Sequence, residues 1–294
     1  MSSFYNHPGL KFIAGPCLLE SYDHACEMVE RISSIMRVNS VPWIYKTSFD
    51  KANRTSHESP RGLGFDRSFY IFNDLKQKYP HLEILTDIHE AWQGDVIRAD
   101  ILQIPAFLCR QTDLLESVAK TNKTINVKKG QFLSPDEMLH VVKKLEHFGA
   151  KEIMLTERGT TFGYNNLVVD MRSLQIMHEF GYPIVMDCTH GVQAPGGLGG
   201  KSGGDRRFAP TLAYAACATG YCDTIFMEVH QDPDNAPSDG ANMIDIKDLD
   251  SIVKKLKRIH DTNYPEEILP ISNYNSNVNR TWAEVQARYD RFDG

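Results

Sequence analysis

The chain has 294 residues, of which 41% are hydrophobic and 24% are charged, which are the proportions of an ordinary soluble globular protein. Its formal net charge of −6 argues against general nucleic-acid binding, because that function usually needs a basic excess. The opening MSSFYNHPGLKF has neither a basic leader nor a long apolar run, and the six cysteines lack the spacing of a disulfide framework. We therefore expect a cytoplasmic protein without a membrane segment.

Eight short runs of apolar and β-branched residues recur along the chain, and each is typical of a strand that is buried on both faces. In order, the runs are KFIAGP, WIYKTSF, EILTDIH, DILQIPAF, TINVKKG, EIMLTERG, PIVMDCTH and TIFMEVH. Helix-like segments lie between several of them, namely HACEMVERISSIM, DLLESVAKT, SPDEMLHVVKKLEHFG and SLQIMHEFG. The last two segments end in Phe-Gly, which is a common way for a helix to stop.

This alternation of strand and helix predicts a parallel sheet with right-handed crossovers. Eight units fit a closed (β/α)8 barrel, the TIM barrel, better than an open sheet. The missing GxGxxG after the first run weakens the dinucleotide-binding alternative. Because no linker divides the chain, we expect a single domain over residues 1–294. Residues 1–10 are expected to cap the bottom of the barrel, and a terminal helix is expected after about residue 262.

Nearly every predicted strand ends in polar or charged residues. These residues are Lys46, Asp87, His89, Lys128, Lys129, Glu157, Arg158, Asp187, His190, Glu228 and His230. One or two of them could simply begin an exposed loop. In a barrel, however, these strand ends meet at the C-terminal face, where active sites lie. So many polar residues at one end predict the site there.

Cations are concentrated at these strand ends. KTSFDKANRTS, residues 46–56, supplies Lys46, Lys51 and Arg54, and three further cations are Arg110, Lys128 and Arg158. As a solvated loop this motif would be unremarkable. Together, the cations could hold two separate anions, which suggests phosphorylated substrates. The loop GGLGGKSGG, residues 196–204, is either a flexible lid or a loop whose Ser202 reaches a phosphate, and the pattern leaves both open.

A metal site is the second hypothesis that the residues suggest. Strand one of a closed barrel lies beside strand eight, so Cys17 can meet Glu228, with His190 and Asp239 at the same rim. Each residue has a plainer interpretation, as a buried thiol, an ion-pair partner, a helix cap or an Asx turn. One thiolate, one imidazole and two carboxylates nevertheless make a sensible site for a divalent first-row metal.

Long motifs carry a resemblance to a known family. They are IAGPC, KTSFDKANRTS, LTDIHE, QIPAFLCRQTDLL, NVKKGQF, LTERGTTFGYNNLVVDMRSL, DCTHGVQ and PGGLGGKSGG. Over almost its whole length the chain resembles the 3-deoxy-D-manno-octulosonate 8-phosphate synthases. The resemblance implies a homotetrameric (β/α)8 barrel that condenses phosphoenolpyruvate, D-arabinose 5-phosphate and water and releases inorganic phosphate, in lipopolysaccharide (Kdo) biosynthesis. It also implies neither a Schiff base nor an organic cofactor.

The resemblance assigns roles to residues of this chain. The implied phosphoenolpyruvate contacts are Lys46, Lys51, Asp87, Pro105, Ala106, Arg110, Gln111, Lys128 and Arg158. The implied arabinose 5-phosphate contacts are Asn53, Arg54 and Ser202, and the implied catalytic residues are His190, Asp239, Lys128 and Asn53. Related synthases of the seven-carbon shikimate precursor typically carry KPRTS where this chain has KANR. The motif therefore favours arabinose 5-phosphate over erythrose 4-phosphate.

The family has a metal-requiring class with Cys in IAGPC and a metal-independent class with Asn there. This chain has Cys17, reads Ser238-Asp239-Gly240 rather than CDG, and carries PGGLGGKSGG. The resemblance thus implies Cys17, His190, Glu228 and Asp239 as ligands of a divalent ion such as Fe, Zn or Mn.

Three alternatives remain at this level. They are a related synthase that uses erythrose 4-phosphate or a mannosamine derivative, a noncatalytic barrel that binds sugar phosphates, and a metal-independent synthase with a buried Cys17 thiol. An imine on Lys46 or Lys51 is disfavoured, because phosphoenolpyruvate has no carbonyl to trap.

Overall fold

The computed structural model describes residues 4–54, 56–196, 203–222 and 224–263. The predicted contact of Ser202 and the predicted terminal helix beyond about residue 262 therefore lie outside the described residues.

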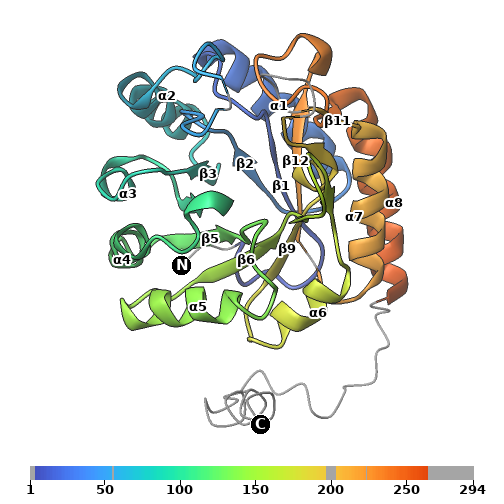
Figure 1. Cartoon of the computed structure of the whole chain (residues 1–294). Coiled ribbons are helices and arrows are strands. Elements are labelled where there is room, and N and C mark those ends of the chain that lie inside the picture. Colours follow the sequence, from blue (N-terminus) through green and yellow to red (C-terminus); the bar gives the residue numbers. More distant parts are fainter. Residues whose placement is uncertain (1–3, 55, 197–202, 223, 264–294) are drawn as a thin grey trace, which may run out of the picture.

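Eight parallel strands pair in chain order and close on themselves, which confirms the (β/α)8 TIM barrel (Figure 1). They are β1 (Lys11–Gly15), β2 (Trp43–Lys46), β3 (Ile84–Asp87), β4 (Ile101–Ile104), β5 (Thr124–Lys128), β6 (Ile153–Glu157), β9 (Ile184–Asp187) and β12 (Thr224–His230). Closure comes from the parallel pairing of β1 with β12. Each strand lies within one of the eight predicted runs.

Helices surround this barrel on its outside (Figure 1). They are α1 (Tyr22–Val38), α2 (Phe65–Lys78), α3 (Gln93–Val96), α4 (Thr112–Lys120), α5 (Met138–His147), α6 (Arg172–His178), α7 (Ala209–Ala218) and α8 (Ile246–Asn263). The two predicted Phe-Gly stops are confirmed, since Gly149 and Gly181 follow α5 and α6 with φ of 95° and 83°. None of the described helices is both long and apolar enough to cross a membrane.

Shorter elements decorate the connections. The two-residue strands are β7 (Thr160–Thr161), β8 (Leu167–Val168), β10 (Gln193–Ala194), β11 (Gly203–Gly204) and β13 (Ile244–Asp245). The single-turn 3-10 helices are η1 (Ala106–Leu108), η2 (His190–Val192), η3 (Arg206–Phe208) and η4 (Pro233–Asn235).

The inside of the barrel is apolar near the beginnings of the strands. One buried layer consists of Ile13, Ile44, Leu85, Ile101, Met154, Val185 and Phe226, and Phe4 packs against it. The Tyr5 hydroxyl donates to the Ile153 carbonyl, 3.3 Å away, at the start of β6. Residues 4 and 5 therefore cover the end where the strands begin, as the predicted cap requires.

The half of the barrel interior nearer the ends of the strands is polar. Successive inward positions are two residues apart, so Ile44 is followed by Lys46, Val185 by Asp187 and Phe226 by Glu228. The apolar layer thus supports a layer of buried charges beneath the C-terminal face.

Gly15 is the point at which β1 leaves the barrel toward Cys17. A Cβ at this position would lie 2.1 Å from the Lys46 carbonyl oxygen, and the backbone has a φ of +155°. We expect Gly15→Ala to lower the free energy of unfolding in urea by about 3 kcal/mol, because backbone would have to move.

Gly163→Ala is the matched control for this effect. Its φ is also positive, at +75°, but an added Cβ would meet nothing within 4 Å. We expect this variant to lose only about 1 kcal/mol, from backbone strain alone. Equal losses in the two variants would contradict the close-approach explanation.

Candidate active site

Buried charges of opposite sign are paired across the upper half of the barrel. The Lys46 Nζ lies 2.5 Å from the Glu228 Oε1, and both side chains are only 1% exposed. Lys128 pairs in the same way with Asp187, and its Nζ also lies 3.7 Å from the centre of the Phe226 ring. Pairing is what makes such burial tolerable, since an isolated buried ion would cost several kcal/mol.

The carboxylates of this network remain ionised. Burial alone would raise the pKa of Glu228, but Lys46, His190 and Lys51 outweigh burial and lower it. The pKa of Asp187 is likewise lowered, against burial, by His190 and Lys128. The site therefore presents fixed negative charges that can hold cations.

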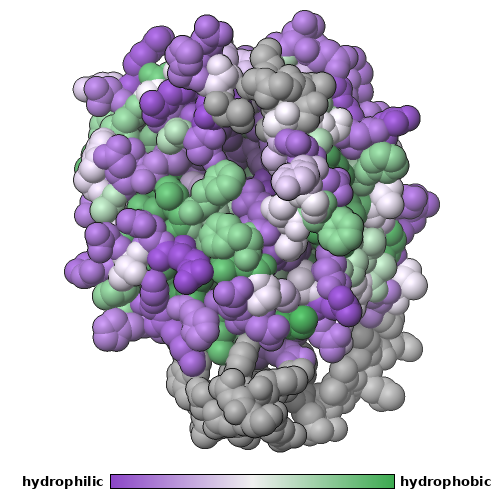
Figure 2. Space-filling view, in the orientation of Figure 1, coloured by the Kyte–Doolittle hydropathy of each residue, from purple (hydrophilic) through white to green (hydrophobic). Residues whose placement is uncertain are grey.

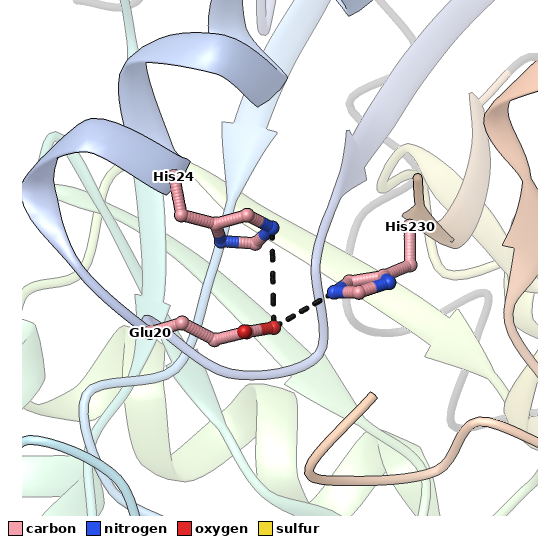
Figure 3. A group of neighbouring side chains, drawn as sticks. All are labelled: Glu20, His24 and His230. Atoms are coloured by element: carbon pink, nitrogen blue, oxygen red, sulfur yellow. Dashed lines mark hydrogen bonds and ion pairs between the residues drawn. The ribbon is translucent and has the colours of Figure 1, made fainter. Parts of the chain in front are cut away.

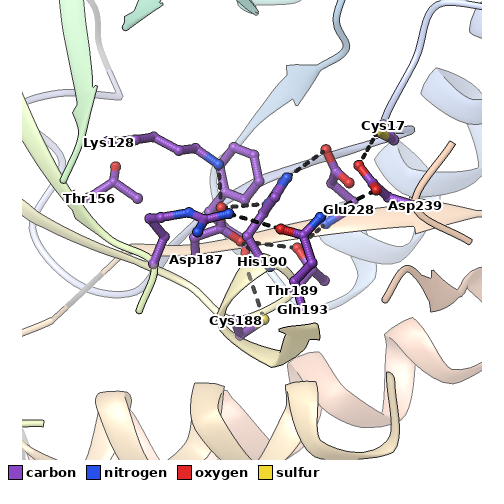
Figure 4. Close-up of polar contacts among 12 residues, drawn as sticks. Cys17, Lys128, Thr156, Asp187, Cys188, Thr189, His190, Gln193, Glu228 and Asp239 are labelled. Atoms are coloured by element: carbon purple, nitrogen blue, oxygen red, sulfur yellow. Dashed lines mark hydrogen bonds and ion pairs between the residues drawn. The ribbon is translucent and has the colours of Figure 1, made fainter. Parts of the chain in front are cut away.

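Cys17, Glu228 and Asp239 come together at the junction of β1 and β12. One ligand atom from each lies within 4.8 Å of the others. Register explains the meeting, because Gly15 pairs with Glu228 across the seam that closes the barrel. The Cys17 Sγ lies 3.2 Å from the Asp239 Oδ2 and 3.1 Å from the Ser238 Oγ. Figure 4 shows the thiol and both carboxylates on the same side of β12.

His190 approaches this group from the end of β9. Its Nε2 lies 3.8 Å from the Glu228 Oε1, while its Nδ1 lies 2.7 Å from the Asp187 Oδ2 (Figure 4). The ionised carboxylate beside Nδ1 orients the ring so that Nε2 faces Glu228. Three of the four residues expected as ligands thus form one group, and His190 approaches it at Glu228, with Asp187 beside its imidazole.

These residues fit a divalent transition metal. Among the described residues, none offers a hydrogen-bond partner to the buried Glu228 Oε2, so this oxygen is available. Burial raises the pKa of the Cys17 thiol, and the charges of Glu228 and Asp239 raise it further against Lys51 and Lys46. A bound cation would displace the thiol proton and would attract the negatively charged ligand atoms gathered here.

Two cations flank the carboxylates. The Lys51 Nζ donates to the Ser48 Oγ at 2.9 Å and lies 3.9 Å from the Glu228 Oε1. Burial would lower the pKa of Lys51, but the nearby carboxylates of Glu228, Asp87 and Asp239 raise it overall. Arg158 is 4% exposed, and its buried Nη1 has no hydrogen-bond partner among the described residues. An ammonium and an unused guanidinium donor can receive an anionic substrate.

Other residues implied by the resemblance lie on connections at the same end of the barrel. Asn53 is exposed after β2, and the Arg54 Nε donates to the Pro60 carbonyl at 3.0 Å. After β4, Pro105 precedes the buried Ala106 of η1, and Arg110 and Gln111 are exposed.

Asp87 lies at the end of β3, buried and 3.1 Å from the His89 Nε2. Its pKa is lowered, against burial, by Lys51, His89 and Lys46.

Three residues that make contacts in this site were assigned no role from the sequence. Asp187 orients His190, Ser238 contacts the Cys17 thiol, and Gln193 bridges Arg158 and Asp239. Asp187 gave a signal, because it ends a predicted strand. Ser238 and Gln193 stand in motifs named above, but those motifs do not reveal their contacts, because the partners are distant in sequence.

A second cluster of possible donors, Glu20, His24 and His230, lies nearby (Figure 3). The His230 Nε2 lies 2.8 Å from the Glu20 Oε1, and its Nδ1 accepts the Asp232 backbone N–H at 3.0 Å. A neutral imidazole that accepts at Nδ1 carries its proton on Nε2. This cluster is therefore a hydrogen-bonded tie between the β1–α1 connection and the end of β12.

One family model and several known relatives match most of this chain. Residues 6–263 match the model of the DAHP synthetase I family. A relative from Rickettsia prowazekii (strain Madrid E) is 56% identical over 250 residues, which cover 84% of this chain and 90% of the relative. One from Rickettsia bellii (strain OSU 85-389) is 54% identical over 248 residues, with the same coverage of both. One from Bartonella tribocorum is 52% identical over 260 residues, or 88% of this chain and 93% of the relative. All three are named 2-dehydro-3-deoxyphosphooctonate aldolase. The chain belongs to the DAHP synthetase I family.

Proposed function

We propose that the chain condenses phosphoenolpyruvate with D-arabinose 5-phosphate and water to give 3-deoxy-D-manno-octulosonate 8-phosphate and phosphate, in Kdo biosynthesis. The names of its relatives support this reaction. The structural observation that carries it is the set of cations and ionised carboxylates buried at the C-terminal face of the barrel. Turnover measured with alternative aldose phosphates tests it.

The cations bring together two substrates that would otherwise repel each other. Lys51 and the Arg158 Nη1 bind phosphoenolpyruvate, together with the other implied contacts at the ends of β2 to β5. Arg110 and Gln111, exposed after β4, extend this pocket toward the rim. Holding both anions in one orientation removes much of the entropic cost of the condensation.

The chemistry proceeds without a Schiff base. The pKa of Lys51 is raised despite burial, by the carboxylates of Glu228, Asp87 and Asp239, so its side chain stays an ammonium. An imine needs a neutral amine. C3 of phosphoenolpyruvate instead attacks the aldehyde carbon, water adds to C2, and phosphate leaves with cleavage of its C–O bond.

Cys17, His190, Glu228 and Asp239 would hold a divalent ion such as Fe, Zn or Mn. When bound, this ion supplies Lewis acidity toward water or the aldehyde oxygen. Asp187 keeps the Nδ1 proton of His190 in place, and the Asp239 carboxylate is positioned to accept a proton. Lys128, paired with Asp187, maintains positive potential beside the reacting carbons.

Arabinose 5-phosphate is the proposed aldose. Asn53 and Arg54 lie on the connection after β2, where the KANR motif differs from the KPRTS of related synthases. An exposed amide at Asn53 can bond a sugar hydroxyl, and Arg54 can bond the phosphate. Ser202 would complete this phosphate contact.

Self-association into a homotetramer is proposed from exposed aromatic residues. Phe162 and Tyr164 are 71% and 99% exposed in the turn between β7 and β8. Phe107 and Phe132 are also exposed, and the Thr161 N–H bonds the Gln131 carbonyl, which places Phe132 beside this turn. Figure 2 shows apolar areas among polar residues on the face turned toward the viewer. Such patches mark protein contacts, and here the partner is a second copy of the chain.

We expect the double variant Phe162→Asp with Tyr164→Asp to assemble less, because carboxylates would be buried at the contact. Light scattering should give a mass below that of the parent protein. Tyr70→Asp is the control, since Tyr70 is 68% exposed on the remote helix α2. An unchanged mass in the double variant, or a monomeric parent, would contradict the proposal.

A reducing cytoplasm is the proposed location. All six cysteines belong to the part of the chain that the structure describes, and they are buried and form no disulfide, which is typical of proteins in a reducing compartment. The proposed partners are the phosphorylated small-molecule substrates, and the reaction uses neither nucleic acid nor a membrane.

A further inference from the structure

Gln193 lies between the two halves of the site. It is the last residue of the DCTHGVQ motif and the first of β10, immediately after η2. Its Oε1 accepts a hydrogen bond from the Arg158 Nη2 at 3.2 Å, and its Nε2 donates to the Asp239 Oδ1 at 3.4 Å. One amide thus links an anion-binding cation to an expected metal ligand.

The bond to Asp239 holds one side of that carboxylate. The other oxygen, Oδ2, accepts a hydrogen bond from the Cys17 Sγ at 3.2 Å (Figure 4). Gln193 and Cys17 therefore bond different oxygens of the Asp239 carboxylate. Asp239 has a φ of 49°, in the left-handed region that aspartate visits more often than most residues other than glycine. Its two hydrogen bonds hold the carboxylate toward Cys17 and Gln193.

The backbone of Gln193 is fixed independently of its side chain. β10 pairs antiparallel with β11, which sets Gln193 opposite Gly204. A Cβ on Gly204 would lie 1.7 Å from the Asn242 Oδ1 and 2.8 Å from the Val192 carbonyl oxygen. This close packing fixes the backbone from which the Gln193 side chain reaches its two partners.

An amide is the side chain that these partners require. Its end carries an acceptor for a guanidinium and a donor for a carboxylate. Glutamate has the same length, but its charge would neutralise Arg158 and repel Asp239. Methionine also has similar length and offers neither hydrogen bond.

We propose that Gln193 is a positioning residue that couples Arg158, the cation that binds phosphoenolpyruvate, to Asp239, an expected metal ligand. This proposal rests on the proposed function, because the roles of Arg158 and Asp239 are taken from that reaction. Loss of the amide loosens Arg158, which weakens phosphoenolpyruvate binding, and loosens Asp239, which weakens metal binding. Arabinose 5-phosphate binding, at the loop after β2, is affected little.

Kinetics of Gln193→Met and Gln193→Glu test the first consequence. We expect the KM for phosphoenolpyruvate to rise about tenfold in the methionine variant and about 100-fold in the glutamate variant. The KM for arabinose 5-phosphate should stay within about threefold of the parent value. A purely structural role predicts the reverse order, with the isosteric polar glutamate tolerated better than methionine, and that order would overturn the proposal.

Titration with Co²⁺ tests the second consequence without turnover. The charge-transfer band of a Cys17 thiolate reports occupancy, and we expect Gln193→Met to weaken Co²⁺ binding about tenfold. Gln175→Met, on the exposed face of α6, is the control and should match the parent. Unchanged Co²⁺ affinity in Gln193→Met would overturn the coupling. If the parent itself gave no turnover, the proposed reaction would fail while this measurement still decided the role of Gln193 toward Asp239.

Discussion

Replacing Cys17 by alanine is expected to weaken binding of Zn²⁺ or Co²⁺ at least about 100-fold, because even an outer partner of a metal ligand contributes about 10- to 100-fold. Cys17 lies in one group with the buried Glu228 and the half-buried Asp239, and its thiol is the only soft donor of the three. Turnover should fall with metal content. Equilibrium dialysis followed by metal analysis measures the first effect, and phosphate release measures the second.

Proton release provides an independent measure of metal binding. Burial and the charges of Glu228 and Asp239 raise the pKa of the Cys17 thiol, so the residue is protonated near neutral pH. Metal binding must displace that proton, and metal affinity therefore rises with increasing pH. In weakly buffered solution the parent should release about one proton more per bound ion than Cys17→Ala.

Cys222→Ala is the control, because its thiol is equally buried, at 1% exposure, but bonds the Thr224 carbonyl. It should bind metal as the parent does. Cys17→Asn should also lose metal, with part of the metal-free turnover surviving. Full activity of the parent after verified stripping, or unchanged metal content in Cys17→Ala, would contradict the proposed metal site.

Arg158→Lys is expected to reduce kcat/KM for phosphoenolpyruvate about 100-fold, which corresponds to about 2.7 kcal/mol of transition-state stabilisation. The guanidinium is buried, one arm bonds Gln193, and the Nη1 arm is unused among the described residues. A lysine ammonium cannot supply both arms in a fixed fork. Steady-state kinetics at saturating arabinose 5-phosphate measure the loss.

Arg172→Lys is the matched control for this substitution. Arg172 also pairs with a carboxylate, Asp170, but its side chain is 85% exposed on the surface. An exposed pair contributes at most about 1 kcal/mol, so kinetics and stability should hardly change. A KM for phosphoenolpyruvate in Arg158→Lys within about threefold of the parent would remove Arg158 from the substrate pocket.

The barrel was predictable because each buried strand has a local pattern of apolar residues. A strand buried on both faces must be apolar over four or five residues, as Ile13 and Ala14 are in β1 or Ile225 and Phe226 in β12. The polar ends of these strands were equally readable. Closure of the barrel then placed Cys17 near Glu228, and the register of β1 with β12 makes this contact direct.

The pairing of charges was not predictable from the same patterns. Lys128 was expected to face substrate, but its ammonium is also bound by Asp187 and lies over Phe226. Such partners are set by side-chain directions inside the barrel, which strand periodicity does not resolve. Gln193 was missed for this reason, since Arg158 and Asp239 lie 35 and 46 residues from it.

Phosphate release from phosphoenolpyruvate in the presence of a panel of aldose phosphates tests the central claim most directly. The account predicts release that requires both substrates and is fastest with arabinose 5-phosphate, with erythrose 4-phosphate much slower because KANR replaces KPRTS. Mass spectrometry should find an eight-carbon 3-deoxy sugar acid phosphate as product. Faster turnover with erythrose 4-phosphate, or no release with any aldose in metal-loaded protein, would contradict the account.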